Sequence, residues 1–342
     1  MLAARKMFDL LDESLQGDIV QIVAGLPAGD ACVLTGSLAE GLGNSRSDVD
    51  VYIISADPRM APRSTAIGFR GSRYLDCVYM SAASLKSLSL RINELSSDDL
   101  WSVRLEDIDR YYRIHIGERI KDSDDLSAII GSFSREAAAR VLRMWAEREL
   151  HAHLARGAVA LLRGESLRAA IHFRQARAWF LNISLCSVGS AYPAIKWTVE
   201  RLAAAGMIAS RSEQEQALRE MTISGQGLQE QLAILRRRAG DLPACRSYSH
   251  YSSMVLRQGL AAVTSEDHVI LLDRRKGRLW EAGWPLVPLI QRMLSGASAT
   301  EALAFFSGTV DLTQSELTAL ADVAFSELER EGLLSASEGV SG

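Results

Sequence analysis

Two aspartates stand at alternate positions of an apolar segment, SDVDVYII, at residues 47–54. Successive side chains of a strand point to opposite faces, so Asp48 and Asp50 would share one face while Val49 turns into the core. Hard divalent cations such as Mg²⁺ prefer carboxylate oxygens, and they are used wherever a triphosphate must be brought to an acceptor oxygen. We therefore expect Asp48 and Asp50 to bind metal.

A Gly-Ser pair, Gly36 and Ser37, ends the preceding apolar run ACVLTG. Glycine permits close approach of the backbone, and a turn that opens a helix presents N–H donors to a phosphate. A third carboxylate on a neighbouring strand would complete a metal site, and Asp76, within the apolar run RYLDCVYM, is the best candidate. These residues together predict a site for a nucleoside triphosphate and Mg²⁺, with a purely structural role as the alternative for Asp76.

Periodicity along the first part of the chain predicts the elements that hold these residues. Apolar residues at helical spacing predict one or two helices before residue 25, and LAEGLG is expected to form a helical turn. The runs ACVLTG, DVDVYII and RYLDCVYM are typical of strands, whereas residues 84–95 and 105–120 have helical periodicity. We expect a first domain of strands and helices over residues 1–130.

Two further parts are predicted beyond it. Residues 134–238 show long helical periodicity with few breakers, which indicates a helical bundle over residues 131–242. The segments HVILLD, RRKG and RLWEAG then predict a β-hairpin followed by three helices, a winged-helix-like domain at residues 255–336. The expected fold class is α+β, with a mixed sheet, a central bundle and a small C-terminal domain.

The segment LTGSLAEGLGNSRSDVDVYII resembles the signature of the polymerase-β-like nucleotidyltransferase superfamily, with the spacing of its antibiotic-modifying members. The resemblance implies that Asp48 and Asp50 bind Mg²⁺, that Ser37 and nearby amides hold the phosphates, and that Asp76 binds metal or acts as a base. Lys196, in AYPAIKWTVERLAAAG, is similar in context to a lysine near the triphosphate in small-molecule nucleotidyltransferases. An ordinary surface lysine is the alternative there.

The C-terminal part is similar in layout to the PqqD-like peptide-chaperone domain, also called the RiPP recognition element. The match consists of Leu272-Asp273, Gly277, Trp280, the Leu-Ser-Gly at 294–296 and a final Leu-x-x-x-Gly-Leu-Leu, without the Leu-Asn that normally follows the second strand. The resemblance implies that a leader peptide adds to the hairpin as an extra strand. The alternative is a winged-helix appendage that packs on the enzyme or mediates dimerisation.

Bulk composition limits the partners. The 342 residues carry a formal charge of −4, and 48% are hydrophobic, which is typical of a globular protein. We expect neither a membrane span nor a nucleic-acid track, since no long apolar run occurs and the segment 315–331 carries five acidic residues and one arginine. The expected location is cytoplasmic; the sequence does not define the oligomeric state.

These observations lead to one main hypothesis and two alternatives. The main hypothesis is a Mg²⁺-dependent nucleotidyltransferase that moves AMP from ATP, or another nucleoside monophosphate from its triphosphate, to an acceptor hydroxyl on a ribosomally made peptide. The first alternative keeps the chemistry and replaces the peptide by a small molecule such as an aminosugar antibiotic. The second is a peptide-binding adaptor that senses a nucleotide without transferring it.

Overall fold

The computed structural model describes residues 7–43, 47–57, 63–70, 73–193, 197–208, 227–240, 242, 250–251, 253–265, 268–273, 276–283, 286–308 and 310–336. Helices and a mixed sheet are both present, which confirms the predicted α+β class. The chain forms two compact units, each considered by itself below. Unit 1 comprises residues 1–95, 103–142 and 185–209, and unit 2 comprises residues 96–102, 143–184 and 210–342.

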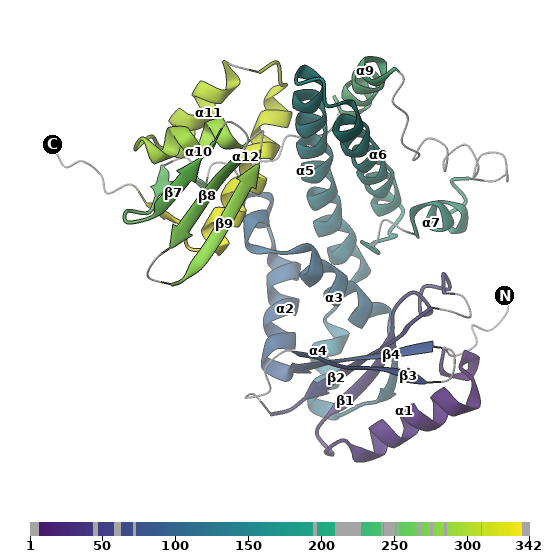
Figure 1. Ribbon diagram of the computed structural model, residues 1–342. Helices are drawn as coiled ribbons and strands as arrows, with labels where there is room; N and C mark the ends of the chain where they lie inside the picture. The colour runs from purple at the N-terminus through teal and green to yellow at the C-terminus, as the bar shows by residue number, and fades with distance from the viewer. Residues whose placement is uncertain are drawn as a thin grey trace. The chain divides into compact units, whose positions relative to one another are not determined.

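Unit 1 is built on a five-stranded sheet with strand order β3-β4-β2-β1-β5 (Figure 1). Its central strands β2 and β4 run parallel, whereas β1 pairs antiparallel with β2 and β5, and β3 pairs antiparallel with β4. The strands are β1 (Ala31–Thr35), β2 (Val49–Ser55), β3 (Arg63–Arg70), β4 (Arg73–Ser81) and β5 (Glu118–Lys121).

Helices cover both faces of this sheet. On one face α1 (Glu13–Gly25) packs Leu15 and Ile19 against a core that includes Val49, Val51 and Ile53 of β2. Because strand side chains alternate, Asp50 lies on the opposite face of β2. The other helices of this unit are η1 (Phe8–Leu10), α2 (Ala82–Glu94), α3 (Leu105–Ile116), α4 (Asp124–Gly131), α7 (Thr198–Ala204) and the first part of α5.

Two details of the predicted secondary structure are wrong. The helix expected over residues 105–120 ends at Ile116, and β5 follows, because its residues pair with the free edge of β1. The segment LAEGLG forms hydrogen-bonded turns instead of a helical turn, with Leu42 and Gly43 both donating to the carbonyl oxygen of Ser37. The structure also adds β3, which the sequence analysis did not predict.

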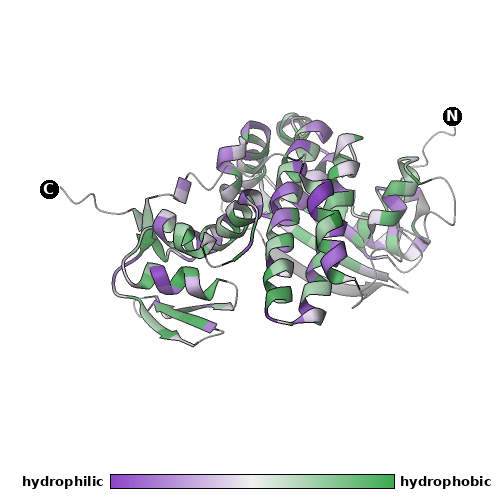
Figure 2. Ribbon diagram, turned by 90° about the horizontal axis from the view of Figure 1, so that it is seen from above, coloured by the Kyte–Doolittle hydropathy of each residue, from purple (hydrophilic) through white to green (hydrophobic). Residues whose placement is uncertain are grey.

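Unit 2 contains most of the two long helices, α5 (Arg135–Leu162) and α6 (Ser166–Ser187). Hydrophobic and hydrophilic residues are mixed along the helices of the chain (Figure 2). Gly157 of α5 faces the Phe173 ring of α6 so closely that a Cβ at this glycine would lie 2.3 Å from a ring carbon. Glycine therefore allows the two helices their close approach. Two further helices of this unit are η2 (Ser97–Ser102) and α9 (Leu228–Ala239).

The C-terminal part of unit 2 confirms the predicted hairpin and the three helices that follow it. A three-stranded sheet has the order β7-β8-β9, and a short pair joins β6 to β10. These elements are β6 (Met254–Leu256), β7 (Ala261–Thr264), β8 (His268–Asp273), β9 (Arg278–Gly283), α10 (Val287–Leu294), α11 (Ala299–Ser307), α12 (Gln314–Arg330) and β10 (Leu334–Ala336).

Helix α5 packs on α12 within unit 2. Arg148 forms a buried ion pair with Asp322 at 3.1 Å, and Ala152 forms an apolar cluster with Ala319 and Val323. A core of side chains from the sheet and from α10 to α12 continues this contact, and it includes Ala155 of α5. The sequence analysis could not see these contacts, and its division of the chain into three domains stays a prediction.

Candidate functional site

The parallel strands β2 and β4 bring two of the predicted carboxylates side by side. Asp50 and Asp76 are register partners, so their side chains lie on the same face of the sheet. Oδ1 of Asp76 is buried and has no hydrogen-bond partner in the described part of the chain. A buried, partnerless carboxylate oxygen is costly unless something binds it. The pair therefore offers carboxylate oxygens to which a hard cation or a proton can bind.

Gly36 lies directly against the Asp50 carboxylate. Its φ of +94° is a conformation that only glycine adopts without strain, and a Cβ built on it would lie 2.0 Å from Oδ2 of Asp50. The preceding residue, Thr35, is the register partner of Asp50 on β1. Glycine at this position thus allows the turn to lie directly against the Asp50 carboxylate.

Ser37 is buried at the start of the turn. Within the described residues, its backbone amide and that of Leu38 donate no hydrogen bond, whereas Ala39, Gly41, Leu42 and Gly43 all donate back into the turn. No helix begins here, so donors for a phosphate would come from the turn itself and not from a helix N-terminus. The predicted phosphate role of Ser37 stays a prediction on this altered basis.

Arg113 of α3 is the site residue that the sequence analysis missed. Its Nη1 lies 2.8 Å from Oδ1 of Asp50, its Nε lies 2.8 Å from Oδ2 of Asp109, and its Nη2 donates to the Tyr192 hydroxyl at 3.2 Å. The hydroxyl of Thr35 donates to the backbone carbonyl of Arg113, which ties α3 to the end of β1. Only the Asp109–Arg113 spacing was visible in the sequence, as an ordinary i,i+4 pair.

Burial sets the charge state of this group. It raises the pKa of Asp50 to about 6, an effect that Arg113 opposes and that Asp76 and Asp109 reinforce. Burial would lower the pKa of Arg113, but Asp109 and Asp50 hold it above its usual range. Arg113 therefore stays charged, and Asp50 is ionised at neutral pH with a narrow margin.

A second contact anchors the turn to α3. The Tyr112 hydroxyl donates to Oε1 of Glu40, which lies in the turn after Ser37. The Tyr112 and Tyr192 rings are 6.1 Å apart between centroids, and burial raises the pKa of Tyr192 to about 12. Both phenols are therefore neutral hydrogen-bonding groups around the carboxylates.

The remaining predicted site residues are not brought into this group. Asp48 is exposed and precedes β2 by one residue. In the described ranges, no three His, Cys, Asp or Glu side chains converge to hold a metal ion, so the structure unites a pair of carboxylates and not the expected three. Lys196 lies outside the described residues. Metal binding by Asp48, Asp50 and Asp76 stays a prediction.

The comparisons with known proteins do not assign a family to the chain. No family model and no curated protein matches the chain. A solved structure of a nucleotidyltransferase-like protein from Exiguobacterium sibiricum 255-15 aligns with 87% of this chain and 89% of its own, at 11% identity and a TM-score of 0.33. Among the described helices, none is long and apolar enough to cross a membrane.

Proposed function

We propose that this chain is a nucleotidyltransferase that transfers AMP from ATP to an acceptor hydroxyl. One observation carries the proposal. The missing side chain of Gly36 leaves space for the Asp50 carboxylate, and Asp76, the register partner of Asp50, has a buried oxygen without a hydrogen-bond partner in the described residues. This is a turn able to approach a phosphate, next to carboxylates able to bind a cation or take a proton. Mg²⁺ is the expected cofactor and would be held by Asp50 and Asp76; Asp48 is proposed as a third ligand from the sequence alone, since its side chain does not converge on the pair in the described residues.

In the proposed reaction the acceptor oxygen attacks the α-phosphorus, a new P–O bond forms, and the bond to pyrophosphate breaks. When bound, Mg²⁺ supplies charge neutralisation at the phosphate oxygens. Oδ1 of Asp76 would take the acceptor proton or hold the ion, and the amides of Ser37 and Leu38 would donate to phosphate oxygens; their lack of partners in the described residues supports both roles. Arg113 holds Asp50 in place through Oδ1.

The proposed acceptor is a peptide. Strand β9 ends the three-stranded sheet, and an edge strand has backbone groups free to pair with an extended chain. This favours the leader-peptide hypothesis. No contact among the described residues supports the aminosugar alternative. Lys196 is proposed to contact the triphosphate, so Lys196→Met should raise the KM for ATP more than it lowers kcat.

A second candidate is nucleotide binding without transfer, as in a nucleotide-sensing adaptor. It is favoured by the ion pair between Arg113 and Asp50, since a guanidinium already neutralises this carboxylate. The two candidates differ in turnover alone.

The test is pyrophosphate release with Mg²⁺ and each labelled nucleoside triphosphate, with leader-containing peptides or aminosugars as acceptors. Asp50→Asn and Asp76→Asn should each lower turnover about a hundredfold or more, whereas Asp125→Asn, at an exposed site on α4, should not. Turnover that survives both site changes rejects the assignment. Nucleotide binding, measured by calorimetry, without turnover towards any acceptor selects the adaptor.

A further inference from the structure

Arg113 places a permanent positive charge among three carboxylates of unit 1. Its guanidinium forms ion pairs with Asp50 and Asp109, and Asp76 adds its negative charge to Asp50 across the parallel strands. An arginine does not lose its proton in a protein. Three ionised carboxylates and one guanidinium leave two negative charges in this group, which one divalent ion balances.

The guanidinium is fixed from several sides. Its ion pairs with Asp50 and Asp109 are both 2.8 Å long, and its Nη2 donates to the Tyr192 hydroxyl at 3.2 Å. The side chain is only 19% exposed, and the hydroxyl of Thr35 ties the Arg113 backbone to the end of β1. Moving the guanidinium away would leave two partly buried carboxylates without their cation, which is costly. An ion that enters the site therefore meets Arg113 in place.

Two carboxylate oxygens of the pair remain for that ion. Arg113 binds Oδ1 of Asp50, whereas Oδ2 of Asp50 and Oδ1 of Asp76 accept no hydrogen bond in the described part of the chain. Oδ2 of Asp50 is also the oxygen that faces Gly36 and the turn. One ion can bind to these two oxygens of neighbouring strands. The position at Oδ1 of Asp50, where a second ion would bind, is taken by the guanidinium.

We propose that the site binds one divalent ion, at Asp50 and Asp76, and that the guanidinium of Arg113 takes the place of a second ion at Oδ1 of Asp50. In sites with two metal ions, both ions stabilise the oxygens of an in-line displacement. Arg113 supplies the second charge from α3, and a guanidinium also has N–H groups that suit a phosphate oxygen. The inference rests on the proposed function, because it assigns the metal content of the same site.

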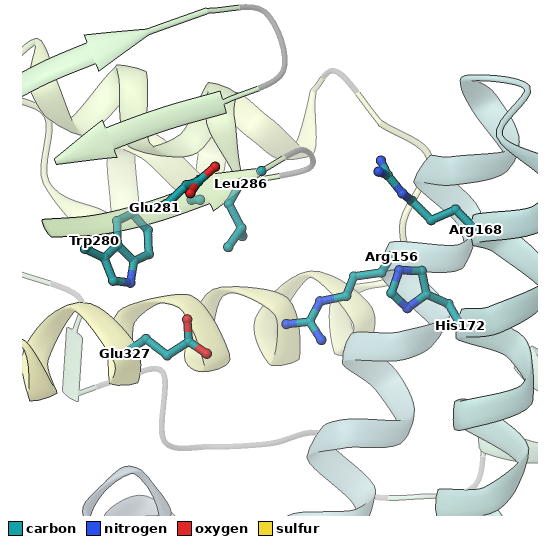
Figure 3. Close-up of a pocket in the computed structure, with 9 residues that line it drawn as sticks. Arg156, Arg168, His172, Trp280, Glu281, Leu286 and Glu327 are labelled. Carbon is teal, nitrogen blue, oxygen red and sulfur yellow. The ribbon is translucent and has the colours of Figure 1, made fainter.

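Acidic side chains also gather at a pocket of about 300 Å³ within unit 2. Figure 3 shows Glu281 of β9 and Glu327 of α12 at this pocket, together with Arg156 and Arg168. The two arginines balance the two carboxylates, so the pocket has no excess negative charge that would attract a cation. An ion bound there would nevertheless enter a count per chain, so the experiment must also locate the ion.

The experiment counts and locates Mn²⁺, which takes the same oxygen ligands as Mg²⁺, on the full chain with a non-hydrolysable ATP analogue. Electron paramagnetic resonance should show one bound Mn²⁺ per chain with the spectrum of an isolated ion. Two ions in one site would be about 3.5–4 Å apart and would couple magnetically. Anomalous scattering from crystals soaked in Mn²⁺ should place the ion at Oδ2 of Asp50 and Oδ1 of Asp76, with Arg113 still bound to Asp50.

Protein variants test the role of the guanidinium. Arg113→Met removes the charge, so a second Mn²⁺ should bind at the freed Oδ1 of Asp50 and give the coupled spectrum, whereas Arg113→Lys should keep the single ion. Arg110→Met is the matched control on the same helix, because Arg110 forms its ion pair with Asp107 at 3.8 Å. It should bind one ion, as should Glu327→Gln in the pocket of unit 2.

Two coupled Mn²⁺ ions in the wild-type protein would overturn the proposal, and this measurement decides it even where Arg113→Met does not fold. A crystal in which the ion has displaced Arg113 from Asp50, or in which the ion lies in the pocket of unit 2, would also overturn it. No bound Mn²⁺ would overturn the metal-dependent function as well. A single ion at the carboxylate pair, without pyrophosphate release towards any acceptor, would support the inference and reject the transfer reaction alone.

Discussion

At the scale of single residues, the site depends on a contact that leaves no room for a side chain at Gly36. The Asp50 carboxylate fills the space that a Cβ would need, and Arg113 binds its other oxygen. The same carboxylate is therefore held from two directions, by steric fit and by charge. Both contacts fix the carboxylate on the face of the sheet that Asp50 shares with Asp76.

Gly36→Ala should disable the site for a steric reason that can be separated from backbone strain. Gly41 also has a positive φ, +72°, but a Cβ there meets nothing within 4 Å. Both alanine variants should therefore lose about 1–3 kcal/mol of unfolding free energy from backbone strain, whereas only Gly36→Ala should displace Asp50 and abolish pyrophosphate release. Urea unfolding and turnover, measured on both variants, check this. Equal activity of the two variants would contradict the Gly36–Asp50 contact.

At the scale of elements, the pairing of α5 with α6 includes two half-buried histidines in direct contact. Burial lowers the pKa of His153 to about 3, as it does for His172, where the neighbouring His153 adds to the effect. One ring must donate and the other accept across the 3.1 Å between their Nδ1 atoms. Burial therefore favours the pair with both rings neutral.

Acid should therefore weaken this helix pair. In the unfolded chain each histidine takes up a proton near its ordinary pKa of about 6.5. In the folded chain each ring stays neutral until the pH approaches its lowered pKa of about 3. The contribution of the pair to the unfolding free energy is fully present above about pH 6.5. Below that pH the unfolding free energy should fall by roughly 1.4 kcal/mol per histidine for each pH unit. The double variant His153→Gln, His172→Gln should show a shallower loss between pH 6.5 and 5 in urea unfolding.

The matched control is His268→Gln, because His268 is exposed on β8. It should keep the pH dependence of the wild-type protein. A double variant whose unfolding free energy falls with acid as steeply as that of the control would show that the histidine pair titrates normally.

At the scale of the whole molecule, the two proposed binding sites belong to different compact units. Gly36, Asp50, Asp76 and Arg113 lie in unit 1, whereas strand β9, the proposed peptide-binding edge, lies in unit 2. The helices α5 and α6 each contribute to both units, with the divisions after Leu142 and Ser184. Each ligand should therefore stabilise its own unit most strongly.

Hydrogen exchange should separate the two sites. A non-hydrolysable ATP analogue with Mg²⁺ should slow exchange in residues 31–55 and 73–81, which contain the turn and both central strands. A bound acceptor peptide should slow exchange in residues 278–283 and leave the central strands of unit 1 unchanged. Protection of β9 by the nucleotide to the same extent as of β2 would contradict the separation.

Local patterns were sufficient to predict much of this protein. Alternation placed Asp50 on a strand, an apolar run placed Asp76 on another, and the hairpin with its three helices followed from turn residues and helical periodicity. Each of these patterns is short in sequence, and each depends on the chain's own hydrophobic and turn residues. The role of Gly36 at the turn could also be predicted from the sequence, since it follows from the absence of a side chain.

Only the tertiary structure decided which of these elements meet. That β5 pairs with β1, that Asp76 lies in register with Asp50, and that Arg113 reaches Asp50 from α3 are long-range outcomes of sheet order and helix packing. Periodicity reports the face on which a residue lies, but the identity of the facing element depends on which edges and apolar surfaces are still free when the chain packs.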